Sequence, residues 1–184
     1  KRQMIKFDEL IIMCQDIAEF GGVFKITEGF VELFGKERVR NTPICESSIV
    51  EVAMGLSICN RKSIVELQFS DFITSGFNPV VNYLAKIHYR WGQNADVVLR
   101  MPCGAGVGAG PFHSQTNEAW FTKTPGLIVV YPAFPEDAKG LLISSIENPN
   151  PVLFFEHKAL YRSIRGNVPE GYYNIEIGKA KLLR

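Results

Sequence analysis

Short apolar segments separated by helix-like segments are the feature of this sequence that most limits its possible folds. The apolar segments cover residues 10–14, 63–69, 97–100, 127–131 and 152–155. The helix-like segments cover residues 47–57, 78–89 and 137–146. Strands that are apolar on both faces and alternate with helices are typical of parallel sheets covered on both sides. The sequence therefore predicts an α/β fold, a mostly parallel sheet with helices on both faces.

The length and charge of the chain limit the number of domains and the kinds of partner that it can have. The 184 residues fit one α/β domain, which at this size buries roughly 70% of the unfolded surface. The formal net charge of +1 gives no electrostatic reason to expect nucleic acid or an anionic membrane as partner. No apolar run approaches the roughly 20 residues that span a bilayer. We therefore expect neither a nucleic-acid nor a membrane partner.

The cysteines and the two ends of the chain indicate its compartment and completeness. Cys14, Cys45, Cys59 and Cys103 form no CxxC pair and lie among apolar or small residues, which predicts free, buried thiols in a reducing compartment. The first residues contain no apolar stretch of the signal-peptide type. The predicted location is the cytoplasm. The abrupt opening and the strand-like pattern beginning near residue 176 lead us to expect a piece of a longer protein.

Polar residues that follow the predicted strands are the first candidates for a site, because ligands of open α/β sheets bind outside the carboxyl ends of strands. Such residues lie at 71–72, 103–113 and 156–158. In the second of these segments, four glycines occupy alternate positions between residues 104 and 110. A phosphate-binding loop is one interpretation, although the spacing matches neither the Walker A pattern nor GxGxxG. The other is a tight, irregular loop with positive φ angles.

Three side chains near these strand ends have both a chemical and an ordinary interpretation. His113, at the end of the glycine-rich loop, suits proton transfer, but a loop histidine can also simply be exposed. Glu46 stands at a turn entering a helix, where a carboxylate also stabilises the helix dipole. Phe72 suits a ligand platform or a loop-anchoring aromatic. The residue types alone leave these alternatives open.

Several strings in fixed order resemble a known family. They are GGVFK at 21–25, FGKERV at 34–39, NTPICES at 41–47, ELQFSDF at 66–72, GAGPFHSQ at 108–115 and FFEHKALYR at 154–162. In this order they closely resemble the beta subunit of the thiamine diphosphate-dependent, decarboxylating component of 2-oxo acid dehydrogenase complexes. The resemblance covers nearly the whole chain. The QFSDF and FFEHK strings favour the branched-chain (2-oxoisovalerate) type over the pyruvate type.

The resemblance implies a pyrimidine-binding domain of the transketolase type and assigns roles to five residues. Glu46 would hydrogen-bond the aminopyrimidine ring nitrogen of thiamine diphosphate and favour its imino tautomer. Phe72 would stack on the pyrimidine, and Ile44 and Gln68 would complete the pocket. His113 would face the thiazolium side and assist the decarboxylated intermediate or its transfer to a lipoyl group.

The resemblance also implies metal ions. A potassium ion would be held near Val97, Ser145 and Ile146 and by the turn from Asn148 to Asn150. Magnesium would be held by a partner domain, because the Gly-Asp-Gly string that binds it in the family does not occur here. The chain departs from the family pattern at two positions. Asn148 stands where the family often has Asp, which puts the potassium site in doubt, and Gln15 stands where Glu is common.

The implied domains are a pyrimidine-binding domain at residues 1–175 and, at residues 176–184, the start of a linker or strand towards a carboxyl-terminal domain. The implied partners are a diphosphate-binding alpha domain or subunit, that carboxyl-terminal beta domain, and the lipoyl domain of the acyltransferase component. Self-association is also expected. The parent protein would be a two-chain enzyme or a fused alpha–beta chain, and the present chain alone would be inactive.

Three alternatives to this function remain. The first is a pyruvate-specific member of the same family. A noncatalytic assembly module of the same fold would tolerate the departures at Gln15 and Asn148, but the joint presence of Glu46, Phe72 and His113 argues against it. A transketolase or deoxyxylulose-phosphate synthase relative would share the fold without the PFHSQ string.

Overall fold

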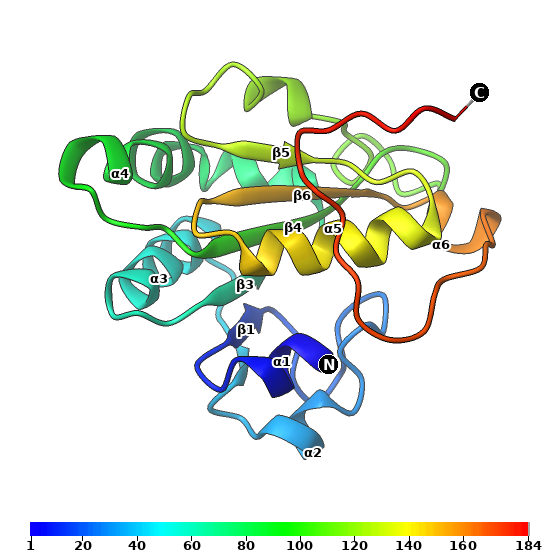
Figure 1. The fold of residues 1–184 in the computed structure, drawn as a ribbon, viewed down its shortest axis with the longest axis horizontal. Helices are drawn as coiled ribbons and strands as arrows, with labels where there is room; N and C mark the ends of the chain where they lie inside the picture. Colours follow the sequence, from blue (N-terminus) through cyan, green and yellow to red (C-terminus); the bar gives the residue numbers. More distant parts are fainter. Residues whose placement is uncertain (184) are drawn as a thin grey trace.

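The computed structural model describes residues 1–183. Its elements, in chain order, are α1 (Arg2–Lys6), β1 (Ile11–Cys14), α2 (Phe30–Phe34), β2 (Val39–Asn41), α3 (Glu46–Ile58), β3 (Ser63–Glu66), η1 (Ser70–Thr74), η2 (Pro79–Leu84), α4 (Ala85–Trp91), β4 (Val97–Cys103), η3 (Glu118–Trp120), β5 (Ile128–Val130), α5 (Pro135–Glu147), β6 (Val152–His157) and α6 (Leu160–Ser163). Figure 1 shows them arranged as one sheet between helices.

The strands formed by residues 1–183 make one six-stranded sheet in the order β2-β1-β3-β4-β6-β5. Every pair is parallel. The longest pairing joins β4 to β6, with Val98 opposite Val152 at one end and Cys103 opposite His157 at the other. β4 is buried along its whole length, as expected for a central parallel strand. The predicted fold class is confirmed.

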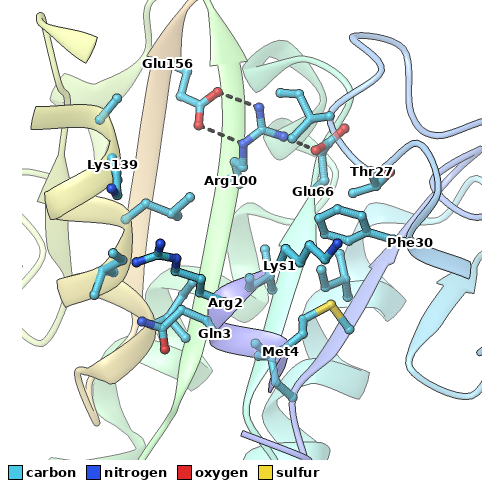
Figure 2. Close-up of a pocket in the computed structure, with 18 residues that line it drawn as sticks. Lys1, Arg2, Gln3, Met4, Thr27, Phe30, Glu66, Arg100, Lys139 and Glu156 are labelled. Atoms are coloured by element: carbon cyan, nitrogen blue, oxygen red, sulfur yellow. Dashed lines mark hydrogen bonds and ion pairs between the residues drawn. The ribbon is translucent and has the colours of Figure 1, made fainter. Parts of the chain in front are cut away.

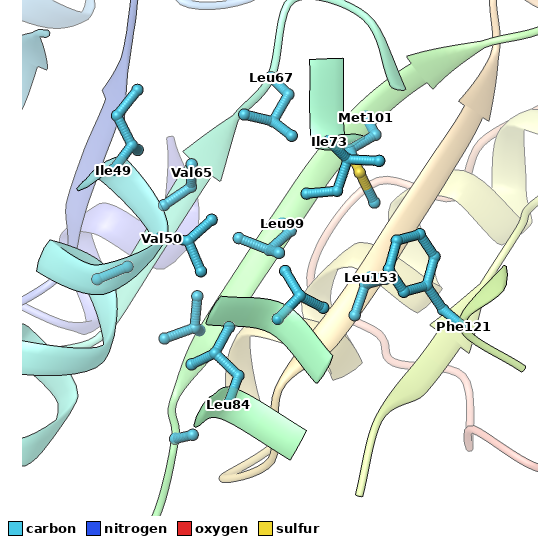
Figure 3. Close-up of a cluster of buried hydrophobic side chains, with 14 of the residues drawn as sticks. Ile49, Val50, Val65, Leu67, Ile73, Leu84, Leu99, Met101, Phe121 and Leu153 are labelled. Atoms are coloured by element: carbon cyan, nitrogen blue, oxygen red, sulfur yellow. The ribbon is translucent and has the colours of Figure 1, made fainter. Parts of the chain in front are cut away.

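Two apolar cores lie on opposite faces of this sheet. Figure 3 shows part of the first, in which Val50 of α3 and Leu84 of η2 lie beside Leu99 of β4. The second core joins Met4 of α1 and Ile146 of α5 to the other side of the strands. Val97, Leu99 and Met101 of β4 belong to the first core, and Val98 belongs to the second, so the strand is buried on both faces.

Several local predictions needed correction. β2 was not predicted because, of its three residues, only Val39 is buried and it therefore carries no apolar run. The strand predicted at 63–69 ends at Glu66, where the chain continues towards η1. The helix predicted at 78–89 begins with π-helical turns before α4. The prediction of buried thiols is right for Cys14 and Cys103 and wrong for Cys45 and Cys59, which are exposed.

The last residues pack along α5. Ile175 donates its N–H to the carbonyl of Gly140 at 3.4 Å, and its carbonyl accepts the Ser144 hydroxyl at 2.5 Å. Figure 1 shows this segment crossing α5. Residues 176–183 form neither helix nor strand, and the predicted domain boundary near residue 175 stays a prediction. Among residues 1–183, no helix is both long and apolar enough to cross a membrane.

Candidate functional site

Two segments that follow neighbouring strands are fastened together at the carboxyl edge of the sheet. One is η1, after β3, and the other is the loop at 104–117, after β4. The Asp71 carboxylate of η1 accepts the backbone N–H groups of Ser114 at 3.1 Å and Gln115 at 3.2 Å. The Asn117 amide donates to the carbonyl of Ser70 at 2.9 Å. These bonds hold the second half of the loop against η1.

This fastening brings His113 onto an aromatic cluster. Its ring centroid lies 4.7 Å from that of Phe69 and 5.5 Å from that of Phe72, and both contacts are edge-to-face. The two phenylalanine rings also meet edge-to-face, 5.7 Å apart. Phe72 and His113, which the sequence placed in one site, therefore lie together.

Glu46, the first residue of α3, lies against the segment that follows η1. Gly76, just beyond η1, packs on it so closely that a Cβ there would lie 3.3 Å from the Glu46 carbonyl oxygen. Glu46 as a whole is 8% exposed. Of the other predicted pocket residues, Ile44 is 83% exposed and Gln68 is half-buried. The site thus combines a largely buried glutamate with an open, partly apolar surface.

Gln15 supports the turn that leads to Glu46. Its side chain is buried, and its amide donates to the carbonyl of Pro43 at 3.2 Å. An ionised glutamate, the residue common in the family at this position, has no hydrogen to donate to that carbonyl. The departure at Gln15 therefore has a structural use in this chain.

The glycine-rich loop has the tight backbone that one of the two interpretations predicted. Gly104, Gly106, Gly108 and Gly110 all have positive φ. At Gly104 a Cβ would lie 2.3 Å from Nε2 of His157, so the imidazole rests directly on the glycine backbone. Glycine is required there both by the φ angle and by this contact.

The residues predicted to hold potassium gather at the opposite edge of the sheet, where β4 and β6 begin. Ser145 and Ile146 lie in the last turn of α5, and the N–H of Ala95 donates to the carbonyl of Pro149 at 3.2 Å. The amide oxygen of Asn148 accepts both the backbone and the side-chain N–H of Asn150 at 2.9 Å. This group is separate from the aromatic cluster.

A buried charge network, which sequence analysis missed, joins β3, β4 and β6. Figure 2 shows Arg100 of β4 between Glu156 of β6 and Glu66 of β3. Arg100 donates to the two Glu156 oxygens at 2.7 and 2.5 Å and also bonds the Glu66 carboxylate. The Tyr161 hydroxyl donates to Glu156 at 2.5 Å. Three strands and α6 are linked by this network.

Burial and the neighbouring charges shift the pKa values of Glu66 and Arg100 in opposite directions. Burial raises the pKa of Glu66, against the attraction of Arg100, which lowers it. Burial lowers the pKa of Arg100, but Glu156 and Glu66 raise it by more, so the guanidinium keeps its charge. Burial also raises the pKa of Tyr161. A cavity of about 500 Å³, bordered by α1 and α5, adjoins the network. Of the predicted site residues, only Ile146 lines it.

The sequence did contain a signal for this network. A charged residue interrupts an apolar run at Glu66 and again at Arg100, and charges are rarely buried unless paired. Within residues 1–183, no group of three or more His, Cys, Asp or Glu side chains is arranged to hold a metal ion.

Comparison with known proteins then places the chain. The model of the transketolase pyrimidine binding domain family matches residues 2–163. The chain belongs to this family. Among curated relatives of this pyrimidine-binding domain, subunit beta of the Bacillus subtilis 2-oxoisovalerate dehydrogenase is 43% identical, over 100% of the chain and 57% of the relative. Mitochondrial subunit beta 2 of the Arabidopsis thaliana 2-oxoisovalerate dehydrogenase is 47% identical, over 90% of the chain and 47% of the relative.

A relative named for pyruvate is slightly less similar. The pyruvate dehydrogenase E1 component subunit beta of Staphylococcus epidermidis is 40% identical, over 99% of the chain and 57% of the relative. The pyrimidine-binding domain described here thus spans about half the length of the curated relatives it matches.

Proposed function

We propose that this chain supplies the pyrimidine-binding half of a thiamine diphosphate site in a 2-oxo acid dehydrogenase. Family membership and the names of the relatives support the cofactor and the reaction class. The observation that carries the proposal is the meeting of Phe72 and His113 at the carboxyl edge, on a segment whose Gly76 packs against Glu46. The branched-chain substrate 2-oxoisovalerate is favoured by the relatives at 43% and 47% identity.

A pyruvate-specific enzyme is the second candidate. The relative at 40% identity is named a pyruvate dehydrogenase subunit. The side chain of the 2-oxo acid would contact parts of the complete enzyme beyond this chain. Rates of decarboxylation of pyruvate and 2-oxoisovalerate by the complete enzyme would decide between the two substrates.

The residues fit a cofactor whose ring nitrogen can share a proton with a carboxyl group. When bound, thiamine diphosphate supplies a nucleophilic thiazolium carbon that adds to the keto carbon and accepts electrons as carbon dioxide leaves. Glu46 would share a proton with the aminopyrimidine ring nitrogen. Phe72 would stack on the pyrimidine, and Ile44 and Gln68 would border it. His113 would move a proton during transfer of the acyl group to a lipoyl sulfur.

The potassium site also fits the residues present. Two carbonyls in the last turn of α5 lack their helical donors: the partner of Ser145 would be Pro149, which has no N–H, and that of Ile146 would be Asn150, whose N–H goes to Asn148. Carbonyl oxygens at the negative end of a helix suit a hard cation. We propose that these carbonyls, with the Val97 region, hold potassium, and that Asn148 shapes the turn. Magnesium is assigned to the partner domain.

The proposed partners are those implied by the family. They are a diphosphate-binding alpha domain or subunit, a carboxyl-terminal beta domain and the lipoyl domain of an acyltransferase, with self-association of the beta portion. The cytoplasmic location stays a prediction, because relatives named mitochondrial occur beside bacterial ones.

Substitution of Glu46 tests the proposed function. In the complete enzyme, Glu46→Gln should slow decarboxylation about 10²–10⁴-fold, the range for a lost general acid–base group. The fold should persist, because the helix dipole accounts for only about 0.3–1 kcal/mol. Glu51→Gln is the matched control, since Glu51 is an exposed carboxylate on the same helix. A Glu46→Gln enzyme within a few-fold of wild type would remove Glu46 from the mechanism.

A further inference from the structure

Lys158 is a buried ammonium group with no role in the site as described so far. It follows β6 directly, and its side chain is 4% exposed. Nζ donates to the carbonyl of Gly104 at 2.7 Å, and the Lys158 backbone N–H donates to the carbonyl of Cys103 at 3.0 Å. The first bond holds the first residue of the loop at 104–117, and the second holds the last residue of β4 just before it.

The same ammonium group faces the aromatic cluster. Nζ lies 5.3 Å from the ring centroid of Phe69, within the range of a cation–π contact. Phe69 in turn packs edge-to-face on His113, with the two ring planes at 88°. The Phe69 ring therefore has Lys158 and His113 as neighbours, and its orientation depends on both.

The other segment also acts on the charge of Lys158. Burial lowers the pKa of Lys158, and Cys103 and the Asp71 carboxylate act in the opposite direction. Asp71 is also the acceptor for Ser114 and Gln115. The loop is thus held at Gly104 by Lys158 and just after His113 by Asp71.

We infer that Lys158 is a positioning residue for His113, acting through the Gly104 carbonyl and the Phe69 ring. The inference deepens the proposed function and rests on it for the consequence in catalysis. Without the ammonium, the Gly104 carbonyl loses its donor and Phe69 loses a neighbour that fixes its rotamer. His113 would then lose its fixed position, while Glu46, on a separate helix, would keep its place.

The test uses the complete enzyme, including its diphosphate-binding partner. Lys158→Met removes the charge at similar volume, and Lys158→Arg keeps a cationic donor. Lys139→Met is the matched control, because Lys139 also bonds a carbonyl, that of Pro169, and also lies over an aromatic ring, 4.7 Å from that of Tyr173. Phe69→Leu is a second route to the same effect that keeps the Gly104 bond.

Single-turnover measurements should separate the two chemical steps. Lys158→Met should slow acyl transfer to lipoyl about 10- to 100-fold, because a shift of about 1 Å in a catalytic group has effects of that size. Carbon dioxide release should change less. Lys158→Arg should recover part of the rate, Phe69→Leu should act like Lys158→Met, and Lys139→Met should match wild type. In a His113→Ala background, Lys158→Met should cause no further loss.

A wild-type rate of acyl transfer in Lys158→Met would overturn the inference. So would a double variant, Lys158→Met with His113→Ala, in which the rate losses of the two single variants multiply. A crystal structure of the complete Lys158→Met enzyme gives a readout independent of chemistry: the His113 ring should be displaced, and an unmoved ring would also overturn it. If His113→Ala itself leaves acyl transfer intact while the ring is displaced by Lys158→Met, the positioning role stands and the proposed role of His113 fails.

Discussion

Arg100 shows how a single residue organises the interior of this domain. It is a 4%-exposed cation enclosed by two carboxylates, each from a different strand. Its replacement would leave Glu66 and Glu156 without the cation that they share. The stability of the sheet at its carboxyl edge therefore depends on one guanidinium group.

Arg100→Met should lower the free energy of unfolding by about 3–5 kcal/mol, the usual cost of removing one partner from a buried ion pair. Urea denaturation of the chain followed by circular dichroism measures this. Arg90→Met, which removes an exposed arginine, is the control and should change stability little. A loss below about 1 kcal/mol for Arg100→Met would be typical of an exposed ion pair and would contradict the buried network.

Glu66 gives the domain a pH dependence of predictable sign. Its folded-state pKa is raised, chiefly by burial, above the ordinary value of 4.5. Its contribution to the free energy of unfolding is therefore fully present below about pH 4.5 and is lost as the pH rises through the folded-state pKa. Unfolding free energies at about pH 5, 6.5 and 8 should fall more steeply for wild type than for Glu66→Gln. Parallel curves for the two proteins would show that Glu66 does not titrate in this range.

Residues that follow strands were predictable from the sequence, and residues inside strands were not. Phe72 and His113 could be proposed from the sequence because both follow predicted strands and both lie in the family strings. Arg100 and Glu66 were missed because each occupies one position of a run that otherwise predicts a buried strand. Their pairing is a property of strand register, which aligns Glu66 with Arg100 across β3 and β4. No single-segment pattern contains that information.

At the scale of elements, the junction of η1 with the loop at 104–117 is the feature that assembles the site. The long strands and helices were predicted because their apolar residues recur over many positions. The short elements that frame the site, such as η1 and β2, have too few residues to show a period. Their conformations depend on side chains elsewhere, as η1 depends on bonds to residues 114–117.

Asp71→Ala should release this junction. It removes the acceptor for two backbone N–H groups, so we expect a loss of about 1–3 kcal/mol in unfolding free energy. Chymotrypsin should also cleave after Phe112 faster than in wild type, because the loop is no longer fastened beside it. Asp71→Asn keeps an acceptor oxygen, so its cleavage rate should lie between those of wild type and Asp71→Ala. Equal cleavage rates in Asp71→Ala and wild type would mean that other contacts hold the loop.

At the scale of the whole molecule, the site is open on the side where a partner is proposed. Ile44 is 83% exposed and Phe112 is 73% exposed, on the segments that carry Glu46 and His113. Apolar side chains in such positions are typical of surfaces that another protein covers. The cofactor would therefore meet only half of its contacts on this chain.

The isolated chain should bind thiamine diphosphate only weakly. Stacking on Phe72 and one hydrogen bond from Glu46 together give about 2–3 kcal/mol, less than the roughly 4 kcal/mol that corresponds to millimolar affinity. Most of the cofactor's charge lies on the diphosphate, whose magnesium ligands are assigned to the partner. Calorimetric titration with cofactor and magnesium is the measurement, and micromolar affinity would place the diphosphate site on this chain.

The position of β6 in the sheet has a consequence for how the chain is made. β6 is the last strand in the described sequence, yet it lies between β4 and β5, which do not pair with each other. A ribosome releases about 5–20 residues per second, so β4 emerges seconds before the strand that will cover its free edge. During that interval β5 has no hydrogen-bonded neighbour at all. The timing of folding is therefore set by residues 152–157, and a nascent chain that stalls before them has an unfinished sheet open to incorrect pairing.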